Sequence, residues 1–271
     1  MYLGAESTAR KGGPAIAFRD LQRAWELLFL LTRRELKLRY QDTALGFIWS
    51  LFKPLLLAAV LFVALKQIVR IDVEDYHLVL LTAIFPWTWF QTSLLIATPA
   101  FASNGALIKK VRFPRAVLPL STITNNGVQF ALSLPIVALA VVLSGERPSP
   151  VWLIGVPVLG FVQLVLMMGV ALFIASLDVF FRDLEHLIEV VLQLWFYVTP
   201  VIYPLAIVPD RWELYLRLNP MTPVIEGWRQ LFMHNTMPAG ELWPALVFSA
   251  AAIVIGAFTF QRTQGSFADA L

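Results

Sequence analysis

Residues 151–176 read VWLIGVPVLGFVQLVLMMGVALFIAS and contain no charged side chain. About 20 consecutive apolar residues let a helix cross the hydrocarbon core of a bilayer, so this run predicts a membrane span. Five further runs are similarly apolar, although the run from Leu187 has just 17 residues and needs neighbouring helices or a thinned bilayer to cross. The sequence thus predicts an all-α membrane protein with six spans, the other five at Leu45–Leu65, His77–Ala102, Ala116–Leu143, Leu187–Tyr203 and Leu242–Phe260.

The third of these spans carries four residues that are unusual in lipid: Asn125, Asn126, Gln129 and Pro135. A membrane helix tolerates such residues where they face other helices or water. We therefore expect the polar side chains to point into the helix bundle.

The composition excludes several classes of protein. Of the 271 residues, 58% are hydrophobic and 14% are charged, whereas globular domains have about 45–50% and about 25%. This excess excludes a soluble enzyme and a disordered chain. The net charge of +3 gives little support for nucleic-acid binding. Because cysteine is absent, disulfides, thiolate metal sites and cysteine nucleophiles are excluded.

The connections between the spans differ in their content of Lys and Arg. The segment up to Ala44, the loops Ser103–Arg115 and Leu177–His186, and the C-terminal tail together hold 14 of them, while the opposite connections hold 6. Cytoplasmic loops are enriched in these cations, which places both termini in the cytoplasm. The expected organisation is a cytoplasmic N-terminal segment (1–44), a six-span membrane domain (45–261) and a cytoplasmic tail (262–271).

The N-terminal segment has an amphipathic helical pattern. Apolar residues recur near helical spacing at Phe18, Leu21, Trp25, Leu28 and Leu36, interleaved with arginines and lysines. This pattern is typical of a helix that lies in the cytoplasmic interface of the membrane and meets anionic lipid. The alternative is a soluble helix packed on a partner protein.

Catalytic signatures are largely missing. The chain has no G-x-x-x-x-G-K-[ST] loop, no H-E-x-x-H pair and no G-x-S-x-G elbow. Its three histidines lack metal-ligand spacing, so we expect no metal and no cofactor on this chain. In the interiors of the first four spans the only charge is Lys53, and Glu189 is a weak candidate for an ion relay. The energy for any transport is therefore expected from another subunit.

Four stretches in order resemble a known family. They are RRELKLRYQDTALGFIWSLFKPLL (33–56), LIKKVRFPRAVLPLS (107–121), LDVFFRDLEHLI (177–188) and TPVIYPLAIVPDRWELYLRLNPMTPVIEGWRQLF (199–232). They are similar to the permease subunits of bacterial ATP-binding-cassette exporters of O-antigen, capsule or teichoic-acid chains, over residues 20–262.

The resemblance implies a homodimer in the bacterial inner membrane, flanked by two copies of a separate ATPase that binds ATP and Mg. The dimer would export a lipid-linked polysaccharide through a channel at its interface. An exporter of a drug or small lipid is the alternative within the class. A membrane-bound polyprenyl-lipid transferase is a distant alternative, because it needs paired carboxylates or histidines at one membrane face.

The same resemblance assigns the loop Ser103–Arg115 as the coupling helix that docks into the ATPase, with Pro114 ending the helix. Its cations and apolar anchors suit a groove on a partner, whereas the alternative is a simple positive-inside loop. A second cytoplasmic contact is expected in the loop Leu177–His186, which could instead be a salt-bridged loop between spans. The assigned residues are Asn104, Leu107, Ile108, Lys109, Lys110, Arg112, Phe113 and Arg115 in the first loop, and Asp178, Arg182 and Asp183 in the second.

The connection Pro204–Glu241 is too long for a turn and predicts two short helices that meet at a proline turn. The resemblance implies re-entrant or gate helices on the outer side, and the alternative is an extracytoplasmic cap. The candidate gate residues are Arg211, Glu213, Asn219, Pro220, Glu226 and Arg229.

A polysaccharide channel needs surfaces on which sugars slide, and aromatic faces cover the apolar side of a sugar ring. Candidates gather on spans one, two and five, although Trp and Tyr also form interfacial belts. Basic residues near the first span would admit the anionic pyrophosphate of the lipid carrier. The channel candidates are Phe47, Trp49, Phe52, Trp87, Trp89, Phe90, Trp195, Phe196, Tyr197 and Tyr203, and the entry candidates are Arg33, Arg34, Lys37, Arg39 and Lys53.

Overall fold

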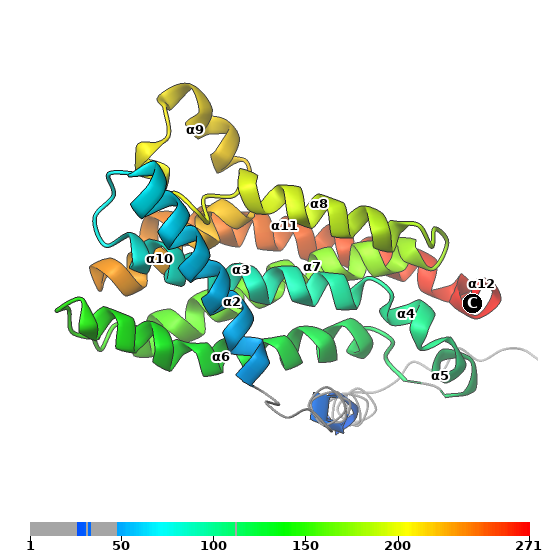
Figure 1. The fold of residues 1–271 in the computed structure, drawn as a ribbon. Helices are drawn as coiled ribbons and strands as arrows, with labels where there is room; N and C mark the ends of the chain where they lie inside the picture. The colour runs from blue at the N-terminus through cyan, green and yellow to red at the C-terminus, as the bar shows by residue number, and fades with distance from the viewer. Residues whose placement is uncertain (1–25, 31, 34–47, 112) are drawn as a thin grey trace, which may run out of the picture.

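A computed structural model describes residues 26–30, 32–33, 48–111 and 113–271, and every regular element in these ranges is a helix (Figure 1). The all-α prediction is therefore confirmed for the described chain. Among the described residues, five helices are long and apolar enough to cross a membrane. They are α2 Ile48–Leu61 with its π-helical continuation η1 Phe62–Val69, α3 Tyr76–Ala97, α6 Val117–Leu143, α7 Trp152–Asp178 and α11 Ala239–Thr263.

The remaining predicted span corresponds to α8, Leu184–Val198, which has 15 residues. At 1.5 Å per residue it extends about 22 Å, less than the ~30 Å thickness of the hydrocarbon core. The helix begins at Leu184, before the predicted Leu187. It ends earlier than predicted because Pro200 forces Thr199 into an extended conformation. The second predicted span also stops early, at Ala97, just before Pro99.

Helix α3 is the centre of the bundle. Its side chains are largely buried, and it contacts α2, α6, α7, α8 and α10. The rings of Trp87 and Phe90 lie 5.4 Å apart in this core. On α6, Asn125 and Asn126 are 0% and 3% exposed, which confirms that they face the bundle.

Helices α7 and α11 form the most extensive helix pair. A Cβ placed on Gly256 would lie 2.9 Å from the carbonyl carbon of Gly169, so both positions need glycine for the backbones to approach this closely. Ser249 donates a hydrogen bond across the pair to the carbonyl of Val162, at 3.0 Å.

Each end of the bundle carries short elements. One end holds η2 Leu205–Ile207, α9 Asp210–Arg217 and α10 Met221–His234, and the other holds α4 Ala100–Ser103, α5 Gly105–Lys110, η3 Gln264–Ser266 and α12 Phe267–Ala270 (Figure 1). Helix α10 packs into the bundle, whereas α9 projects away from it. Two helices thus follow α8, and Pro220 lies between them as the sequence predicts.

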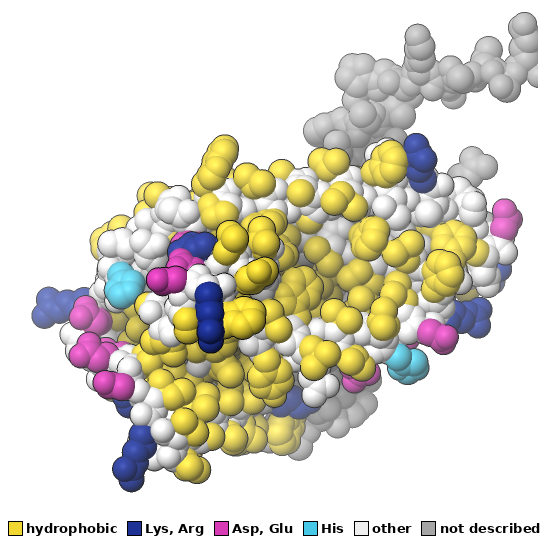
Figure 2. Space-filling model, turned by 90° about the horizontal axis from the view of Figure 1, so that it is seen from above, with side chains coloured by type: hydrophobic (Ala, Val, Ile, Leu, Met, Phe, Trp, Pro, Cys, Tyr) yellow, Lys and Arg dark blue, Asp and Glu magenta, His cyan; other side chains and the backbone are white. Residues whose placement is uncertain are grey.

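The surface has a broad apolar flank, with charged side chains gathered mainly toward the two ends of the molecule (Figure 2). Large apolar residues of α2 and η1 such as Leu56, Val60 and Val63 are about half exposed. Such a surface suits lipid or another membrane helix rather than water.

Candidate functional site

The predicted coupling loop forms a short helix at one end of the bundle. Ser103 Oγ donates to the carbonyl of Pro99 at 2.6 Å, and the Asn104 side-chain amide donates to the carbonyl of Ala100 at 2.9 Å. These bonds turn the chain from α4 into α5. Along α5, Ile108 is buried while Lys109 and Lys110 are exposed. The helix therefore presents its cations outward and anchors its apolar side.

Helix α5 ends at Lys110, and Val111 is already extended, so the helix stops before Pro114 is reached. This differs from the prediction that Pro114 ends it, because the chain leaves the helix four residues earlier. Leu107 and Phe113 are partly buried against the same apolar cluster as Ile108. The predicted Arg112 lies outside the described residues.

The second predicted cytoplasmic contact is the loop between α7 and α8, and its three candidate residues differ in burial. Asp178 is 3% exposed, whereas Arg182 and Asp183 are exposed. Within the part of the chain that the structure describes, no ion pair joins these three residues. Arg182 and Asp183 therefore offer a surface to a partner, and Asp178 does not in this conformation.

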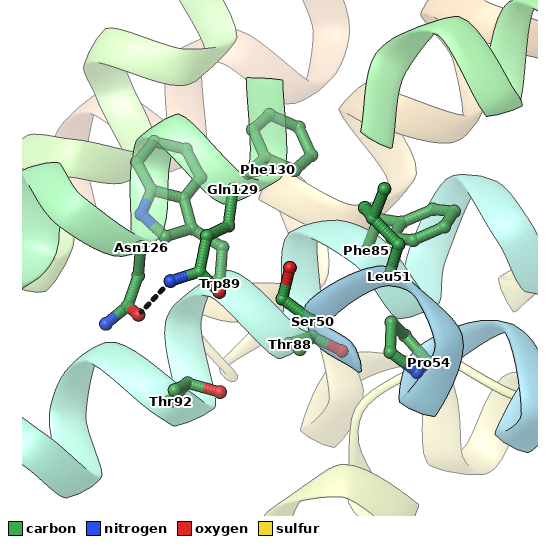
Figure 3. Close-up of a pocket in the computed structure, with 10 residues that line it drawn as sticks. All are labelled: Ser50, Leu51, Pro54, Phe85, Thr88, Trp89, Thr92, Asn126, Gln129 and Phe130. Atoms are coloured by element: carbon green, nitrogen blue, oxygen red, sulfur yellow. Dashed lines mark hydrogen bonds between the residues drawn. The ribbon is translucent and has the colours of Figure 1, made fainter. Parts of the chain in front are cut away.

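A pocket with mixed chemistry opens between α2, α3 and α6 (Figure 3). Its cavity volume is about 30 Å³. Five uncharged polar side chains and three aromatic rings contribute to its wall, and none of its lining residues is charged. The polar residues are Ser50, Thr88, Thr92, Asn126 and Gln129, and the aromatic pair with a stacked arrangement is Trp89 and Phe130.

The pocket wall is held by local bonds. Gln129 Nε2 lies 3.4 Å from Asn126 Oδ1, as the dashed line in Figure 3 marks. The Trp89 indole donates to the carbonyl of Ile123 at 3.0 Å, and its ring stacks on Phe130 with centroids 5.0 Å apart. Hydroxyls, amides and ring faces are the groups that contact sugars, which are polar at their edges and apolar on their faces.

The other channel candidates fall into two groups. Trp87, Phe90 and Phe196 are nearly fully buried in the single chain, and Trp195 is partly buried. By contrast, Trp49, Phe52 and Tyr197 are 44%, 46% and 57% exposed. In this conformation the exposed residues are the ones that a substrate or second subunit could touch. Tyr203 is partly exposed, and Phe47 lies outside the described residues.

At the opposite end, Asn219 links α8 to α10. Its Oδ1 accepts from the Trp195 indole and from the Met221 backbone, both at 2.9 Å. Its amide donates to Thr199 Oγ1 at 2.8 Å. Three bonds thus fix the turn at Asn219–Pro220, and the predicted aromatic Trp195 is part of this network.

A buried ion pair fixes the chain that follows α8. Arg229 is 4% exposed, pairs with Glu226, and donates to the carbonyl of Pro200 at 2.7 Å. Glu226 also accepts from the backbone of Leu205 at 3.1 Å. Burial lowers the pKa of Arg229, and the adjacent Glu226 carboxylate opposes this effect. Two of the candidate gate residues, Glu226 and Arg229, thus form an ion pair with each other.

The other charged gate candidates lie on α9. Arg211 is exposed and its guanidinium lies 5.8 Å from the centroid of the Trp212 ring. Glu213 pairs with Arg217 at 2.8 Å, and Arg217 reaches Glu241 of α11 at 3.7 Å. The first pair lies within α9, and the second connects α9 to the bundle, where such a surface pair contributes little energy.

The entry candidates are described in part. Arg33 and Lys53 are exposed. Arg34, Lys37 and Arg39 lie outside the described residues, as does most of the predicted interface helix. The described residues 26–30 and 32–33 are helical.

Two structural contributors were not singled out in the sequence. Gln163, in the middle of the apolar α7, donates to the carbonyl of Pro86 and accepts from the Trp228 indole, both at 2.8 Å. A lone glutamine in a 27-residue apolar helix could have been recognised in the sequence, because polar residues in membrane helices usually face the bundle and have a partner there. Phe267 is fully buried at the end of the chain, and a single phenylalanine in a short tail carries no comparable signal.

Comparison with known proteins gives a consistent picture. The sequence profile of a family described as "ABC-2 type transporter" matches residues 26–233. An O-antigen export system permease protein RfbA from Klebsiella pneumoniae is 33% identical over 248 residues, covering 91% of this chain and 95% of that protein. The RfbA protein of Myxococcus xanthus is 32% identical over 259 residues, covering 93% and 98%.

A more distant relative transports a different polymer. The polysialic acid transport protein KpsM of Escherichia coli is 24% identical over 252 residues, covering 88% of this chain and 93% of that protein. These relatives are aligned over nearly their whole length.

Proposed function

The chain belongs to the ABC-2 type transporter family, and from this premise we propose that it is the transmembrane subunit of an ATP-driven exporter of a lipid-linked, O-antigen-like polysaccharide. The observation that carries the proposal is the near full-length similarity to permeases named for O-antigen export. The chain itself lacks a phosphate-binding loop. Its ATPase partner, with ATP and Mg, is therefore a separate subunit.

The proposed membrane topology has six crossings with both termini in the cytoplasm. Near the start of α7, the Trp152 indole donates to Asn235 Oδ1 at 2.9 Å, just before α11 begins. Beyond the other ends of α7 and α11, the rings of Phe180 and Phe267 lie 6.4 Å apart. The two helices thus run parallel, and the chain must return to the opposite side between them. Helix α8 contacts α3 and α7, which supports its role as the sixth crossing.

The proposed assembly is a homodimer with a channel between its two copies. Helices α2 and α8 leave most of their side chains uncovered in the single chain. These uncovered faces include the aromatic residues Trp49, Phe52 and Tyr197. A second copy packed there would place ring faces along a shared passage, where a sugar chain could slide with weak contacts at each ring. The exposed Arg33 and Lys53 would meet the pyrophosphate of the lipid carrier.

The outer helices would gate this passage. Helix α9 is exposed and is tied to α11 through weak surface pairs, whereas α10 is fixed by the bonds of Asn219 and Arg229. A movable α9 on a fixed α10 suits a gate. The channel and gate roles rest on these exposures and contacts.

The decisive experiment is depletion of the protein in its own host. We expect the surface glycan to disappear and a lipid-linked glycan to accumulate on the cytoplasmic side of the inner membrane. Restoration by the wild-type chain, with an ATPase subunit co-purifying, completes the result. An intact surface glycan after depletion would contradict the proposal and favour the export of a drug or small lipid.

A matched pair of charge reversals tests the coupling surface. Lys110→Glu changes an exposed cation on α5, and Arg147→Glu changes an exposed cation at the opposite end of the molecule. We expect Lys110→Glu to reduce ATPase co-purification by about tenfold, while Arg147→Glu leaves it unchanged. Equal retention of the ATPase by both variants would remove α5 from the docking surface without affecting the assignment of substrate.

A further inference from the structure

The C-terminal tail folds back onto the coupling helix. After α11, the chain forms η3 and α12, which lie at the same end of the molecule as α4 and α5 (Figure 1). Helix α12 contacts α5 directly. The last residue also participates, because a Cβ on Gly105 would lie 3.4 Å from Leu271 Cβ, an ordinary van der Waals distance.

The tail is anchored by one aromatic side chain. Phe267 is fully buried, and its ring centroid lies 4.9 Å from that of Phe101 on α4 and 6.1 Å from that of Phe260 on α11. Ile108 of α5 belongs to the same apolar cluster. The cluster therefore joins the coupling helix, the tail and the ends of two spans, α7 and α11.

A cation reinforces this arrangement from the other side. The Arg115 guanidinium lies 5.8 Å from the centroid of the Phe267 ring and donates a hydrogen bond to the carbonyl of Gln264. Arg115 lies two residues before Val117, the first residue of α6. The tail is thus held by the chain on both sides of α5.

Helix α5 needs such support for a mechanical reason. It has six residues, and an isolated helix of this length is unstable in water because nucleation is costly. A helix that receives force from a partner must be fixed to the elements that move. The apolar cluster around Phe267 provides the contact between α5 and the spans.

We propose that residues Gln264–Leu271 are a positioning element that braces the coupling helix against α7 and α11, so that movement of the ATPase reaches the spans. This inference rests on the proposed function. It assigns the tail, and Phe267 in particular, to the coupling between ATP hydrolysis and export. Asp269 and Ala270 are exposed, as are Lys109 and Lys110 of α5, and α12 and α5 lie together at the end that meets the ATPase.

The placement of the tail can be tested without measuring transport. The chain has no cysteine, so the double variant Gly105→Cys/Leu271→Cys introduces a single defined pair. The 3.4 Å separation given above is close to the ~3.5–4.5 Å between Cβ atoms in disulfides. We expect the pair to cross-link under mild oxidation in the assembled transporter, and export to continue after cross-linking. Absence of the cross-link would overturn the proposal.

The coupling role is tested in the full complex with its ATPase. Phe267→Ala is compared with Phe161→Ala, which removes a 66% exposed ring from α7, and with the conservative Phe267→Leu. At equal membrane level, we expect Phe267→Ala to lower glycan export per ATP hydrolysed by about tenfold. Phe161→Ala should resemble the wild type, and Phe267→Leu should recover most of the loss.

The outcomes separate this proposal from the function on which it rests. Normal export per ATP in Phe267→Ala, in a complex whose wild type exports glycan, would overturn the brace and leave the exporter assignment intact. Failure of the wild type itself to restore surface glycan would instead contradict the exporter assignment. If Phe267→Ala fails to accumulate, the milder Phe267→Val provides the same ratio, and a ratio equal to that of the wild type would again overturn the brace.

Discussion

We predict that Gly256→Ala strongly destabilises the protein, because the backbones of α7 and α11 meet at this residue. The added Cβ would lie 2.9 Å from the carbonyl carbon of Gly169 and closer still to its carbonyl oxygen, whereas ordinary contact begins at 3.4 Å. Both obstacles are backbone atoms of a packed helix, so no side chain can rotate away. The helices must separate by more than half an ångström along their most extensive contact.

The cost follows from the overpacking. Extra carbon atoms in a well-packed interior cost about 1–3 kcal/mol, and a rigid backbone obstacle places this substitution near the upper value. For a chain of this size the melting midpoint should fall by roughly 5–10 °C. Small residues at helix contacts are also the main determinant of close packing in membranes, so little compensation is available from nearby groups.

The assay is thermal unfolding of the purified protein in detergent, followed by the loss of the folded peak on size exclusion. The matched control is Gly160→Ala, because Gly160 lies on α7, the helix that Gly256 of α11 meets, and a Cβ there meets nothing within 4 Å. We expect the control to equal or slightly exceed the wild type, since alanine favours a helix over glycine. A Gly256→Ala variant as stable as this control would refute the close-packing argument.

Three further substitutions test the interior polar contacts. Gln163→Leu removes the acceptor of the Trp228 indole, and the same thermal scan should show a loss of about 2 kcal/mol; an unchanged midpoint would mean that the bond adds no stability. Arg229→Met leaves the mostly buried Glu226 without its cation and should cost about 3 kcal/mol. Adding Glu226→Gln should then recover part of that loss, and no recovery would argue against the ion pair as the cause. Asn219→Ala breaks three hydrogen bonds and should speed amide hydrogen exchange at the start of α10 while leaving exchange in α7 unchanged. Equal exchange rates at the start of α10 in the variant and the wild type would count against this network.

The spans could be predicted closely because length and apolarity decide them. The run Val151–Ser176 corresponds to α7, Trp152–Asp178, and Ala116–Leu143 corresponds to α6, Val117–Leu143. In both cases the ends are set by where apolar side chains give way to polar ones, which is visible in the sequence. The prediction was less accurate where proline decides the end, as at Thr199–Pro200, because apolarity continues past the break.

The candidate sites could be predicted in part. The pairing of Glu226 with Arg229 follows from helical spacing, which places residues three apart on one face. The sequence could not predict which aromatic residues are buried and which are exposed. Trp87 is buried and Trp49 is exposed, although both lie in apolar helices. Helix α3 is surrounded by neighbours while α2 covers one side of the bundle, and this difference arises from tertiary packing.

The least predictable feature is the tail, and it bears most directly on coupling. Phe267 meets Phe260 of α11, and the same apolar cluster includes Val179 at the end of α7. Further along the bundle, Gly169 and Gly256 hold these two helices together at backbone distance. Because α7 and α11 are joined at both places, a displacement of α5 reaches them as one packed pair. In the proposed coupling role, the six-residue α5 would therefore move a larger unit than its own length suggests, and the proposed brace and the glycine contact would be two parts of one connection.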